Sequence, residues 1–487
     1  MKIRLPIATM LLAIVGAIPA HASLGAATIM DSPNPPEGRY FQLSAVSCTT
    51  TTSCSAVGTY QTIRGINRTL AMRMNGQGWS LESTPNTASN EYNRLEGVDC
   101  VDETFCMAVG NSSPDYYRSI LTMVRDGSTW SIVPGPATSP TSSASLTSVS
   151  CVSNSMCVAV GTLETGVSAK TPLILRWDGS SWSHMPAPSL PSDRYNILNS
   201  VSCISATFCT AVGKHRKNLN IGQEVGTLVI TWNGSSWSNV NAPLNTTLDW
   251  VNLASIDCAS RESCVSVGDY RSDTGPIDGP ILPLILRWDG TNWTRESPPA
   301  VRDSAEIYLH SVSCTSPSAC AVIGLKWSSS PGYEPLAITL AGAVWTEISV
   351  PKVTGSEGAP RLSAVSCTND SHCVAVGNSE ISYNNIRTTV VVLGPYVAPP
   401  TSAPSTSPTL SSMTRRNVPS SKLVKAAGIG IPKGAKVTLT VSSKYRNVCK
   451  VVGSTVRTTG KGTCPVKIVV TTKAKKRTSK TVTIKVG

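Results

Sequence analysis

Leu362-Ser-Ala-Val-Ser-Cys-Thr-Asn-Asp-Ser-His-Cys-Val-Ala-Val-Gly377 is the most informative segment of this 487-residue chain. It contains an alternating apolar run, a cysteine, five residues, a second cysteine and another apolar run that ends on glycine. Alternation with a period of two residues predicts β-strands, so the stretch reads as one hairpin. The six other copies begin at Leu43, Leu95, Leu146, Leu198, Leu253 and Leu309.

The copies recur at intervals of 51 to 56 residues. In the third repeat, strands are predicted at residues 146–151, 157–161, 173–177 and 182–186, and the other repeats follow the same scheme. A period near fifty residues with four short strands is typical of a β-propeller, in which each repeat forms one blade. We therefore predict an all-β fold whose main domain is a seven-bladed β-propeller.

A recurrent turn pattern separates the third and fourth strands of the repeats. Five of the six complete repeats carry Asn-Gly or Asp-Gly there, as at Asp178-Gly179, and these dipeptides favour type I′ turns. A tryptophan follows every one of the six turns, and its regular recurrence predicts packing between neighbouring blades. These tryptophans are Trp79, Trp130, Trp182, Trp237, Trp293 and Trp345.

The seventh repeat lacks its fourth strand. After residues 388–393 the chain has neither a turn nor a tryptophan, and a proline-rich stretch follows. Residues 27–33 stand at the same distance before the first repeat as residues 79–85 stand before the second. We predict that this N-terminal segment supplies the outer strand of the last blade, which leaves no open strand edge.

The first 22 residues have the features of a secretory signal peptide. Residues 1–4 are positively charged, residues 5–18 are apolar but too few to span a bilayer, and Ala20-His21-Ala22 is a cleavage site of small residues. The mature chain would begin at Ser23 and contain no transmembrane segment. We therefore expect a secreted, extracellular protein, either free or associated with the cell surface.

Sixteen cysteines fit an oxidising compartment, where paired cysteines form disulfides. Zinc is the competing interpretation, but the Cys-x5-Cys spacing and the presence of only five histidines disfavour it. We expect no metal and no cofactor. The cysteines predicted to form disulfides are Cys48, Cys54, Cys100, Cys106, Cys151, Cys157, Cys203, Cys209, Cys258, Cys264, Cys314, Cys320, Cys367, Cys373, Cys449 and Cys464.

Charge divides the chain into a mildly acidic body and a basic tail. Residues 401–487 hold 18 Lys and Arg and no acidic residue, which leaves 24 basic against 29 acidic residues elsewhere. We predict a propeller at residues 23–393, a Pro/Ser/Thr-rich linker at 394–421 and a small basic β domain at 422–487. The tail should bind an anionic polymer of the cell envelope, and its exported location argues against nucleic acid. An acidic glycan as partner and a solvated, highly charged fold without a partner are the alternative interpretations.

Three resemblances to known families accompany these patterns. Asp178-Gly-Ser-Ser-Trp182 resembles the Asp box of sialidase-like propellers, although the Asp box spaces its aspartate five residues before the tryptophan and this chain spaces it four. The array at residues 23–393 resembles the cysteine-paired propellers of secreted actinobacterial proteins. The tail resembles bacterial immunoglobulin-like domains at residues 448–453 and 462–464, which implies a small β-sandwich.

In a propeller, the loops between second and third strands and between blades lie on one face, where ligands usually bind. Here these loops hold aromatic and charged side chains that suit glycans or protein surfaces. Ordinary polar surface loops are the alternative interpretation. The candidate ligand face consists of Tyr92, Arg94, Tyr117, Arg118, Arg194, Tyr195, Trp250, Tyr270, Arg271, Tyr308 and Trp327.

No catalytic residues can be assigned from the sequence. A sialidase needs three arginines, a tyrosine nucleophile with a glutamate partner and an acid, and no pattern here matches that set. His215 and His372 are predicted to be surface residues rather than catalysts. We therefore predict a non-enzymatic propeller that binds glycan or protein, with a sialidase-like exo-glycosidase as the alternative.

Overall fold

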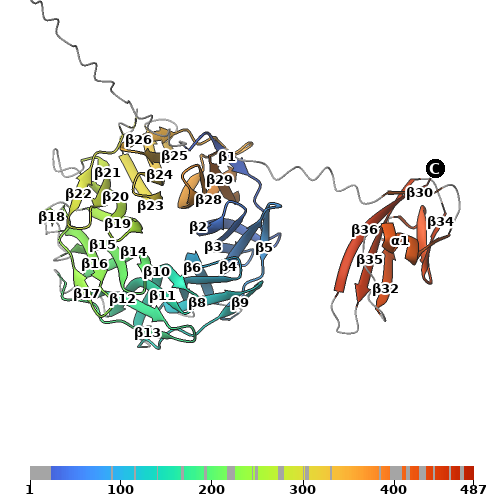
Figure 1. Cartoon of the computed structure of the whole chain (residues 1–487), viewed down its shortest axis with the longest axis horizontal. Coiled ribbons are helices and arrows are strands. Elements are labelled where there is room, and N and C mark those ends of the chain that lie inside the picture. The colour runs from blue at the N-terminus through green and yellow to red at the C-terminus, as the bar shows by residue number, and fades with distance from the viewer. Residues whose placement is uncertain are drawn as a thin grey trace, which may run out of the picture. The chain divides into compact units, whose positions relative to one another are not determined.

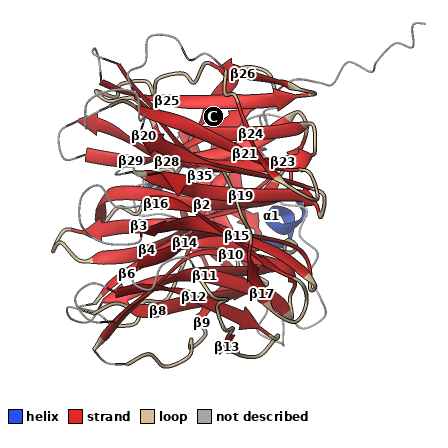
Figure 2. Ribbon diagram, turned by 90° about the vertical axis from the view of Figure 1, so that its left-hand side faces the viewer, coloured by secondary structure: helices blue, strands red, loops and turns tan. Residues whose placement is uncertain are grey.

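The computed structural model describes residues 24–88, 91–113, 117–139, 141–165, 169–190, 195–216, 225–243, 245–246, 250–271, 279–299, 301, 306–328, 332–382, 385–394, 409–412, 417–426, 435–441, 445–459, 462–471 and 477–486. The predicted signal peptide and Arg194 lie outside these residues. The chain forms two compact units, Met1–Tyr396 and Val397–Gly487. Strands dominate both units, and α1 (Ser420–Ala426) is the one helix among the described residues (Figure 2).

In unit 1 the strands pair antiparallel in groups of four, one group per sequence repeat, and the groups surround a common centre (Figure 1). The first strand of each group lies nearest the centre and the fourth lies farthest from it. The strands of repeats 1 to 3 are β2 (Gly38–Thr50), β3 (Ser53–Thr62), β4 (Asn67–Asn75), β5 (Trp79–Glu82), β6 (Tyr92–Cys100), β7 (Phe105–Ser113), β8 (Ser119–Asp126), β9 (Thr129–Ile132), β10 (Ser142–Ser153), β11 (Met156–Thr165), β12 (Ala169–Trp177) and β13 (Trp182–His184).

Repeats 4 to 7 follow the same order. Their strands are β14 (Tyr195–Ser205), β15 (Phe208–Arg216), β16 (Val225–Trp232), β17 (Trp237–Asn239), β19 (Val251–Ser260), β20 (Ser263–Arg271), β21 (Ile281–Trp288), β22 (Trp293–Glu296), β23 (Glu306–Ser316), β24 (Ala319–Ser328), β25 (Gly332–Ala341), β26 (Val344–Ile348), β27 (Arg361–Asn369), β28 (His372–Ser382) and β29 (Asn385–Leu393). A short strand, β18 (Asn245–Thr246), pairs with β16, and one parallel bridge from Lys170 to Tyr195 joins repeats 3 and 4.

The outer position of the seventh group is occupied by β1 (Ala27–Met30), which runs antiparallel to β29. Ala27 lies opposite Leu393, and Met30 lies opposite Val390. Met30 is buried in a core cluster that also contains Trp79 and Val390, so β1 packs against the first repeat as well. The chain's first described strand therefore completes the group made by the last repeat of unit 1.

The tryptophans pack between neighbouring groups, as the sequence predicted. Trp182 of repeat 3, for example, shares a buried cluster with Met107 of repeat 2. In two places the indole also donates a hydrogen bond to the preceding repeat. Trp130 Nε1 bonds Glu82 Oε2 at 2.8 Å, and Trp345 Nε1 bonds Glu296 Oε2 at 2.8 Å.

Each second strand contains one glycine, four residues after its cysteine, and this glycine has a steric reason. A Cβ added at Gly161 would lie 2.0 Å from the Ser145 carbonyl oxygen, where a β-bulge at residues 146–148 brings the first strand close. The equivalent glycine of every repeat meets a carbonyl oxygen at 2.0 Å or less. Only a residue without a side chain fits this site.

The turns after the third strands differ from the predicted type I′ geometry, which was wrong. That turn needs two residues with positive φ, but only the glycine has it, as in Gly179 with a φ of 101°. The loop between Trp177 and Trp182 contains four residues. Asp178 Oδ1 accepts bonds from the backbone N–H groups of Ser180 and Ser181, both at 2.8 Å, which explains the Asp-Gly-Ser-Ser pattern.

A closed circle of hydrogen bonds joins the inner strands, and we call it the Ser/Asp ring. The residue before the first cysteine of each repeat accepts a bond from the backbone N–H of the first cysteine in the next repeat. The last repeat bonds the first in the same way. The acceptors and their donors are Ser47 with Cys100 (3.0 Å), Asp99 with Cys151 (2.7 Å), Ser150 with Cys203 (3.0 Å), Ser202 with Cys258 (3.1 Å), Asp257 with Cys314 (2.7 Å), Ser313 with Cys367 (3.0 Å) and Ser366 with Cys48 (3.0 Å).

All sixteen cysteines form disulfides. Within each repeat the first cysteine bonds the second, and their strands hold them directly opposite each other. The eighth disulfide joins Cys449 to Cys464 in unit 2.

Unit 2 contains two small sheets. One has the order β30-β36-β35-β32 and the other β31-β34-β33, and Cys449 of β33 bonds Cys464 of β35, so the disulfide connects the sheets. The predicted linker at 394–421 is too long, because β30, β31 and the start of α1 lie inside it. The strands of this unit are β30 (Thr409–Ser412), β31 (Asn417–Pro419), β32 (Lys436–Val441), β33 (Cys449–Val452), β34 (Thr455–Thr458), β35 (Gly462–Thr471) and β36 (Arg477–Val486).

Candidate functional site

The strand order gives unit 1 two distinct ends. Each disulfide hairpin and each third-to-fourth turn lies at the same end of its four-stranded group, which we call the disulfide face. The connections between second and third strands and between repeats lie at the opposite end, the loop face. Most of the sequence-predicted ligand residues stand on or near the first residues of strands that begin at the loop face.

In each repeat, the residues directly before and after one fully buried leucine line the centre of unit 1. The leucine of each repeat, such as Leu146, points into the core, so its neighbours Ser145 and Thr147 point the other way. A cavity of about 300 Å³ is lined by such residues from four inner strands. Its wall consists of Gln42, Ser44, Glu96, Asn111, Arg118, Ser145, Leu146, Thr147 and Ser363.

An ion pair involves Glu96, whose side chain lines this central cavity. Arg94 Nε lies 3.3 Å from Glu96 Oε1, and both side chains are partly exposed. Arg118 lines the same cavity from the start of repeat 2's third strand. One of the predicted arginines is therefore paired with a carboxylate, and Arg118 has Glu96 in the same wall.

A tyrosine and a glutamate meet at the loop-face end of β23. Tyr308 Oη donates a hydrogen bond to Glu306 Oε2 at 2.9 Å. Burial of the phenol, followed by the bond to Glu306, raises the pKa of Tyr308 above its ordinary value. The phenol therefore stays protonated at neutral pH.

Two further side chains extend this cluster across repeats 6 and 7. The ring of Tyr333 lies 6.4 Å from the ring of Tyr308 in a tilted arrangement, and Tyr333 is 42% exposed. The guanidinium of Arg361 stands 5.7 Å from the centre of the Tyr333 ring, within reach of a cation–π interaction. The exposed tyrosine is thus held between a second aromatic ring and a cation.

A groove runs beside this cluster. It consists of two adjoining cavities of about 360 and 400 Å³, whose walls share Lys352 and Ala359. Inside it, Lys326 Nζ bonds Glu347 Oε1 at 2.8 Å. We call it the repeat 6–7 groove, and its charged and aromatic residues are Lys326, Tyr333, Glu334, Glu347, Lys352, Glu357, Arg361 and Glu380.

Trp250 forms a second exposed platform, between repeats 4 and 5. Its indole N–H donates to Asp269 Oδ1 at 2.7 Å, and Lys214 Nζ stands 4.5 Å from the ring centre. Burial raises the pKa of Asp269 to about 6 and lowers that of Lys214. The tryptophan is 38% exposed, so these contacts fix its orientation and leave one part of the ring open.

The other predicted ligand residues are less uniform. Tyr92 and Tyr117 are each 47% exposed, but neither lines the repeat 6–7 groove. Lys170 Nζ lies 5.8 Å from the centre of the Tyr195 ring. Trp327 is half-buried and lies opposite Glu306 on the neighbouring strand.

Tyr270 needs a correction. It is only 8% exposed, because the Arg295 guanidinium covers its ring at 4.4 Å. The neighbouring Arg271 is half-buried, and its backbone N–H bonds the Trp250 carbonyl at 3.0 Å. Both residues are therefore packed against other residues of repeat 5 and Trp250 rather than displayed on the loop face.

The prediction that His215 is a surface residue was also wrong, since this side chain is only 3% exposed. Its position in β15 alternates into the core, which the short loop sequence did not reveal. His372 is half-buried, and burial lowers its pKa. Within the described parts of the chain, no three His, Cys, Asp or Glu side chains are arranged to hold a metal ion.

Sequence reasoning missed Lys352, Glu357 and Glu380 as members of the site. Lys352 and Glu357 belong to the 12-residue connection from β26 to β27, the longest between two described groups. Its length was the available signal, because extra loop residues often build binding sites. Glu380 lies near the end of β28 and carried no signal of its own.

Comparisons with known proteins give structural neighbours only. No protein-family model and no curated protein sequence matches the chain. It is similar to a protein of unknown function from Dyadobacter fermentans, at 12% identity over 78% of this chain and 100% of that one, with a TM-score of 0.43.

Two carbohydrate-active enzymes are among the other neighbours. A GH74 xyloglucanase from Xanthomonas campestris is 10% identical over 74% of this chain, with a TM-score of 0.44, and the match covers 55% of that enzyme. The polysaccharide lyase Uly1 is 10% identical over 78% of this chain and 94% of that chain, also with a TM-score of 0.44. What this protein binds has to be inferred from its own side chains.

Proposed function

We propose that unit 1 is a seven-bladed β-propeller that acts outside the cell and binds a glycan in the repeat 6–7 groove without transforming it. The observation that carries this proposal is the exposed ring of Tyr333, positioned by Tyr308 and Arg361 at the edge of a groove rich in both carboxylates and amines. Seven disulfide hairpins and the closed Ser/Asp ring support the propeller assignment.

The chemistry of the groove suits a sugar. The flat C–H face of a pyranose packs against an aromatic ring, and its hydroxyl groups need both donors and acceptors around them. Tyr333 offers the ring, Lys352 and Arg361 offer donors, and Glu357 and Glu380 offer acceptors. All five side chains belong to one cavity and are exposed to solvent.

A panel of neutral and acidic oligosaccharides tests this proposal, with the oxidised full-length protein as the probe. We expect binding that falls at least about tenfold in Tyr333→Ala and in Arg361→Ala, because each removes a contact of the kind that dominates interfaces. Tyr117→Ala is the matched control, since Tyr117 is equally exposed but lies outside the groove. Binding that survives both groove variants would place the site elsewhere.

The second candidate function is a sialidase-like exo-glycosidase, and the Tyr308–Glu306 hydrogen bond favours it. In such an enzyme the tyrosine attacks the sugar while the glutamate removes its proton. The raised pKa of Tyr308 opposes this role, because a nucleophile needs the reverse shift. Fluorogenic sialosides and neutral glycosides should therefore stay intact; turnover that disappears in Tyr308→Phe would establish the enzyme.

For unit 2 we propose an immunoglobulin-like β-sandwich that attaches the protein to an anionic polymer of the cell envelope. Its two sheets share one core and one disulfide, as a small sandwich requires. Lys436, Lys450, Arg457 and Lys467 are exposed, and the unit contains no acidic residue to compensate them. The partner should therefore be polyanionic.

A further inference from the structure

The disulfide of repeat 2 has a charged neighbour at a position where the other repeats have an apolar residue. In every repeat the second cysteine lies opposite one residue of the third strand, and in repeat 2 that residue is Arg125. The other six repeats place an apolar side chain there. These residues are Met74, Trp177, Trp232, Trp288, Leu340 and Leu393.

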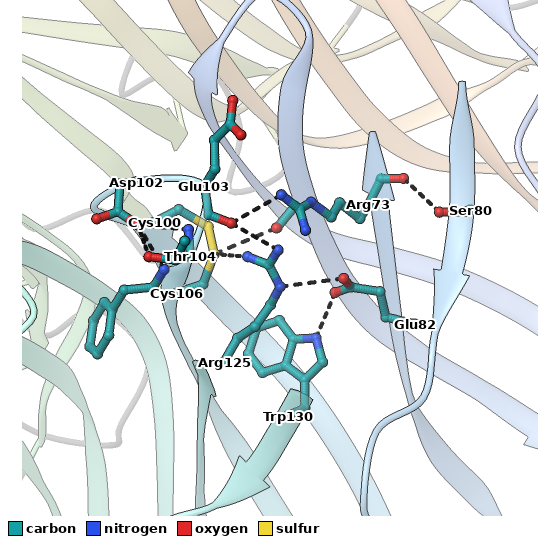
Figure 3. Close-up of polar contacts among 12 residues, drawn as sticks. Arg73, Ser80, Glu82, Cys100, Asp102, Glu103, Thr104, Cys106, Arg125 and Trp130 are labelled. Carbon is teal, nitrogen blue, oxygen red and sulfur yellow. Dashed lines mark hydrogen bonds and ion pairs between the residues drawn. A yellow bond between two sulfur atoms is a disulfide. The ribbon is translucent and has the colours of Figure 1, made fainter. Parts of the chain in front are cut away.

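Arg125 is buried and points at the disulfide (Figure 3). Its Nη1 donates to Cys106 Sγ at 3.3 Å, while Nη2 donates to the Glu103 carbonyl at 3.1 Å. The side chain is 1% exposed, so water does not screen the charge from the sulfur. The hydroxyl of Ser55, in repeat 1, lies 3.5 Å from the same sulfur and is also buried.

The surroundings hold Arg125 in this position. Glu82 Oε1 lies 3.3 Å from Arg125 Nε, and the other oxygen of Glu82 accepts the bond from Trp130. Arg73 stands close by and donates to the same Glu103 carbonyl at 3.0 Å, but it makes no contact with sulfur. Asp102, the other acid nearby, is engaged by the backbone of Thr104 and Phe105.

We propose that Cys100–Cys106 is a site of thiol–disulfide exchange, at which an extracellular dithiol reduces this disulfide before the others. Cys106 is fully buried and Cys100 is partly exposed, so the incoming thiolate reaches Cys100. A buried cation beside a sulfur stabilises its thiolate, and a more stable thiolate leaves faster. Arg125 and Ser55 both act on the sulfur that leaves.

The exchange proceeds in two balanced steps. A thiolate of the dithiol attacks Cys100 Sγ, the bond between the cysteines breaks, and its electron pair remains on Cys106 Sγ beside Arg125. The second thiol of the dithiol loses its proton and attacks the dithiol's own sulfur in the mixed disulfide, which closes the dithiol into a disulfide and releases Cys100 as a thiolate. The protein disulfide gains two electrons, and the dithiol becomes a disulfide after losing two electrons and two protons.

Limited reduction of the folded protein tests the proposal. The full-length protein is treated with a small amount of dithiothreitol near pH 7.5, the free thiols are alkylated at intervals, and peptides are quantified by mass spectrometry. We expect Cys100 and Cys106 to be alkylated at least about threefold faster than any other Cys-x5-Cys pair, because only their leaving thiolate has a buried cation. A different pair that reacts as fast would overturn the proposal.

Variants separate the effect of the cation from local opening of the hairpin. Arg125→Leu copies the residue found in repeats 6 and 7 and should remove the advantage of Cys100–Cys106. Arg73→Leu is the matched control, because Arg73 shares the carbonyl but not the sulfur, and it should leave the order unchanged. If Arg125→Leu folds and Cys100–Cys106 still reacts first, local opening is the cause and the proposal fails.

A milder variant covers the case in which Arg125→Leu does not fold. Ser55→Ala removes only a hydroxyl contact to Cys106 Sγ and should slow the reduction of Cys100–Cys106 relative to the other pairs. An unchanged rate in Ser55→Ala, with no advantage in the native protein, would equally overturn the proposal.

Discussion

At the scale of single residues, the Ser/Asp ring contains two carboxyl groups where the other five repeats use a serine. Asp99 and Asp257 accept the same backbone bond as the serines do, at the shorter distance of 2.7 Å. Burial raises the pKa of Asp99 to about 6, with a smaller contribution from the charge of Asp257, and burial also raises the pKa of Asp257. Both charges therefore cost stability at neutral pH.

Replacement of Asp99 by serine should stabilise the protein near pH 7 by on the order of 2 kcal/mol, because a pKa of about 6 in the folded protein means that the charged form of Asp99 is disfavoured there. The new serine hydroxyl would keep an acceptor for the Cys151 N–H, as the equivalent serines do, without a buried charge. Between pH 6 and 4 the folded protein holds a proton on Asp99 that the unfolded chain has lost, so native stability rises as pH falls through this window.

The stabilising effect of Asp99→Ser should accordingly shrink from pH 7 to pH 4 and vanish below it. Thermal melts of both proteins over this range measure the difference in melting temperature. Glu357→Gln, a change of an exposed carboxylate, is the control and should show little dependence. A constant difference between Asp99→Ser and the native protein at all pH values would contradict the assignment of the pKa.

At the scale of the elements, the strands were predictable because their causes are local. The alternation around each Cys-x5-Cys pair, the glycine within the second strand and the tryptophan after the turn all reflect contacts within one hairpin or with a neighbouring repeat. The turn type was missed because Asp178 bonds the backbone through its side chain, which a two-residue rule does not describe. The repeat 6–7 groove was missed because strand pairing, rather than a local pattern, brings side chains of β24, β25, the β26–β27 connection and β28 together.

The unusual charge of Arg125 could have been recognised from the sequence, whereas its contact could not. Aligned repeats put it among tryptophans, leucines and a methionine, so its exceptional charge was visible. Its contact with Cys106 was not, because the register between β7 and β8 sets it. Residues that depart from a repeat can therefore be found from sequence, whereas their partners require the structure.

Substitution of Gly161 by alanine should destabilise unit 1 by several kcal/mol, because its new Cβ would overlap the Ser145 carbonyl, which belongs to the backbone and cannot move aside. Denaturant unfolding at constant disulfide content measures the loss. Gly25→Ala is the control, since nothing lies within 4 Å of a Cβ there. Equal stability of the Gly161 and Gly25 variants would show that the bulge adapts at no cost.

Loss of β1 should destabilise unit 1, because it uncovers the edge of β29 and removes Met30 from the core. Met30→Ala should cost roughly 2 to 3 kcal/mol, and deletion of residues 24–31 should lower the melting temperature by about 5 °C or more. Thr28→Ala changes an exposed residue of the same strand and should have no effect. A deletion variant that melts like the native protein would mean that β29 needs no partner.

At the scale of the whole molecule, the chain combines two units of opposite charge character. The first unit is mildly acidic and carries its variable residues on the loop face, while the second contains only basic ionisable side chains apart from tyrosine and the terminus. No helix within the described residues is long and apolar enough to cross a membrane. If the protein is held at a cell surface, charge attraction through unit 2 is the physical means that the sequence offers.

Binding to an anionic polymer should therefore depend on unit 2 and on salt. The full-length protein should sediment with envelope preparations rich in phosphate polymers at about 20 mM salt and be released at about 500 mM, where exposed charges are screened within a few Å. A chain that ends at residue 396 should remain in solution at both concentrations. Equal binding of the two chains, or binding that ignores salt, would argue against attachment through this unit.

The pairing of β1 with β29 also determines when, during translation, the last group of strands can be completed. Ser32, next to β1, bonds Thr388, which follows it by 356 residues. The ribosome makes the first partner of this contact at the start and the second near the end, so β1 has nothing to pair with during most of translation. A chain interrupted before β29 would keep both edges of the unfinished ring uncovered, and such edges associate with other chains. An incomplete polypeptide is therefore expected to aggregate, whereas the complete chain can cover both edges.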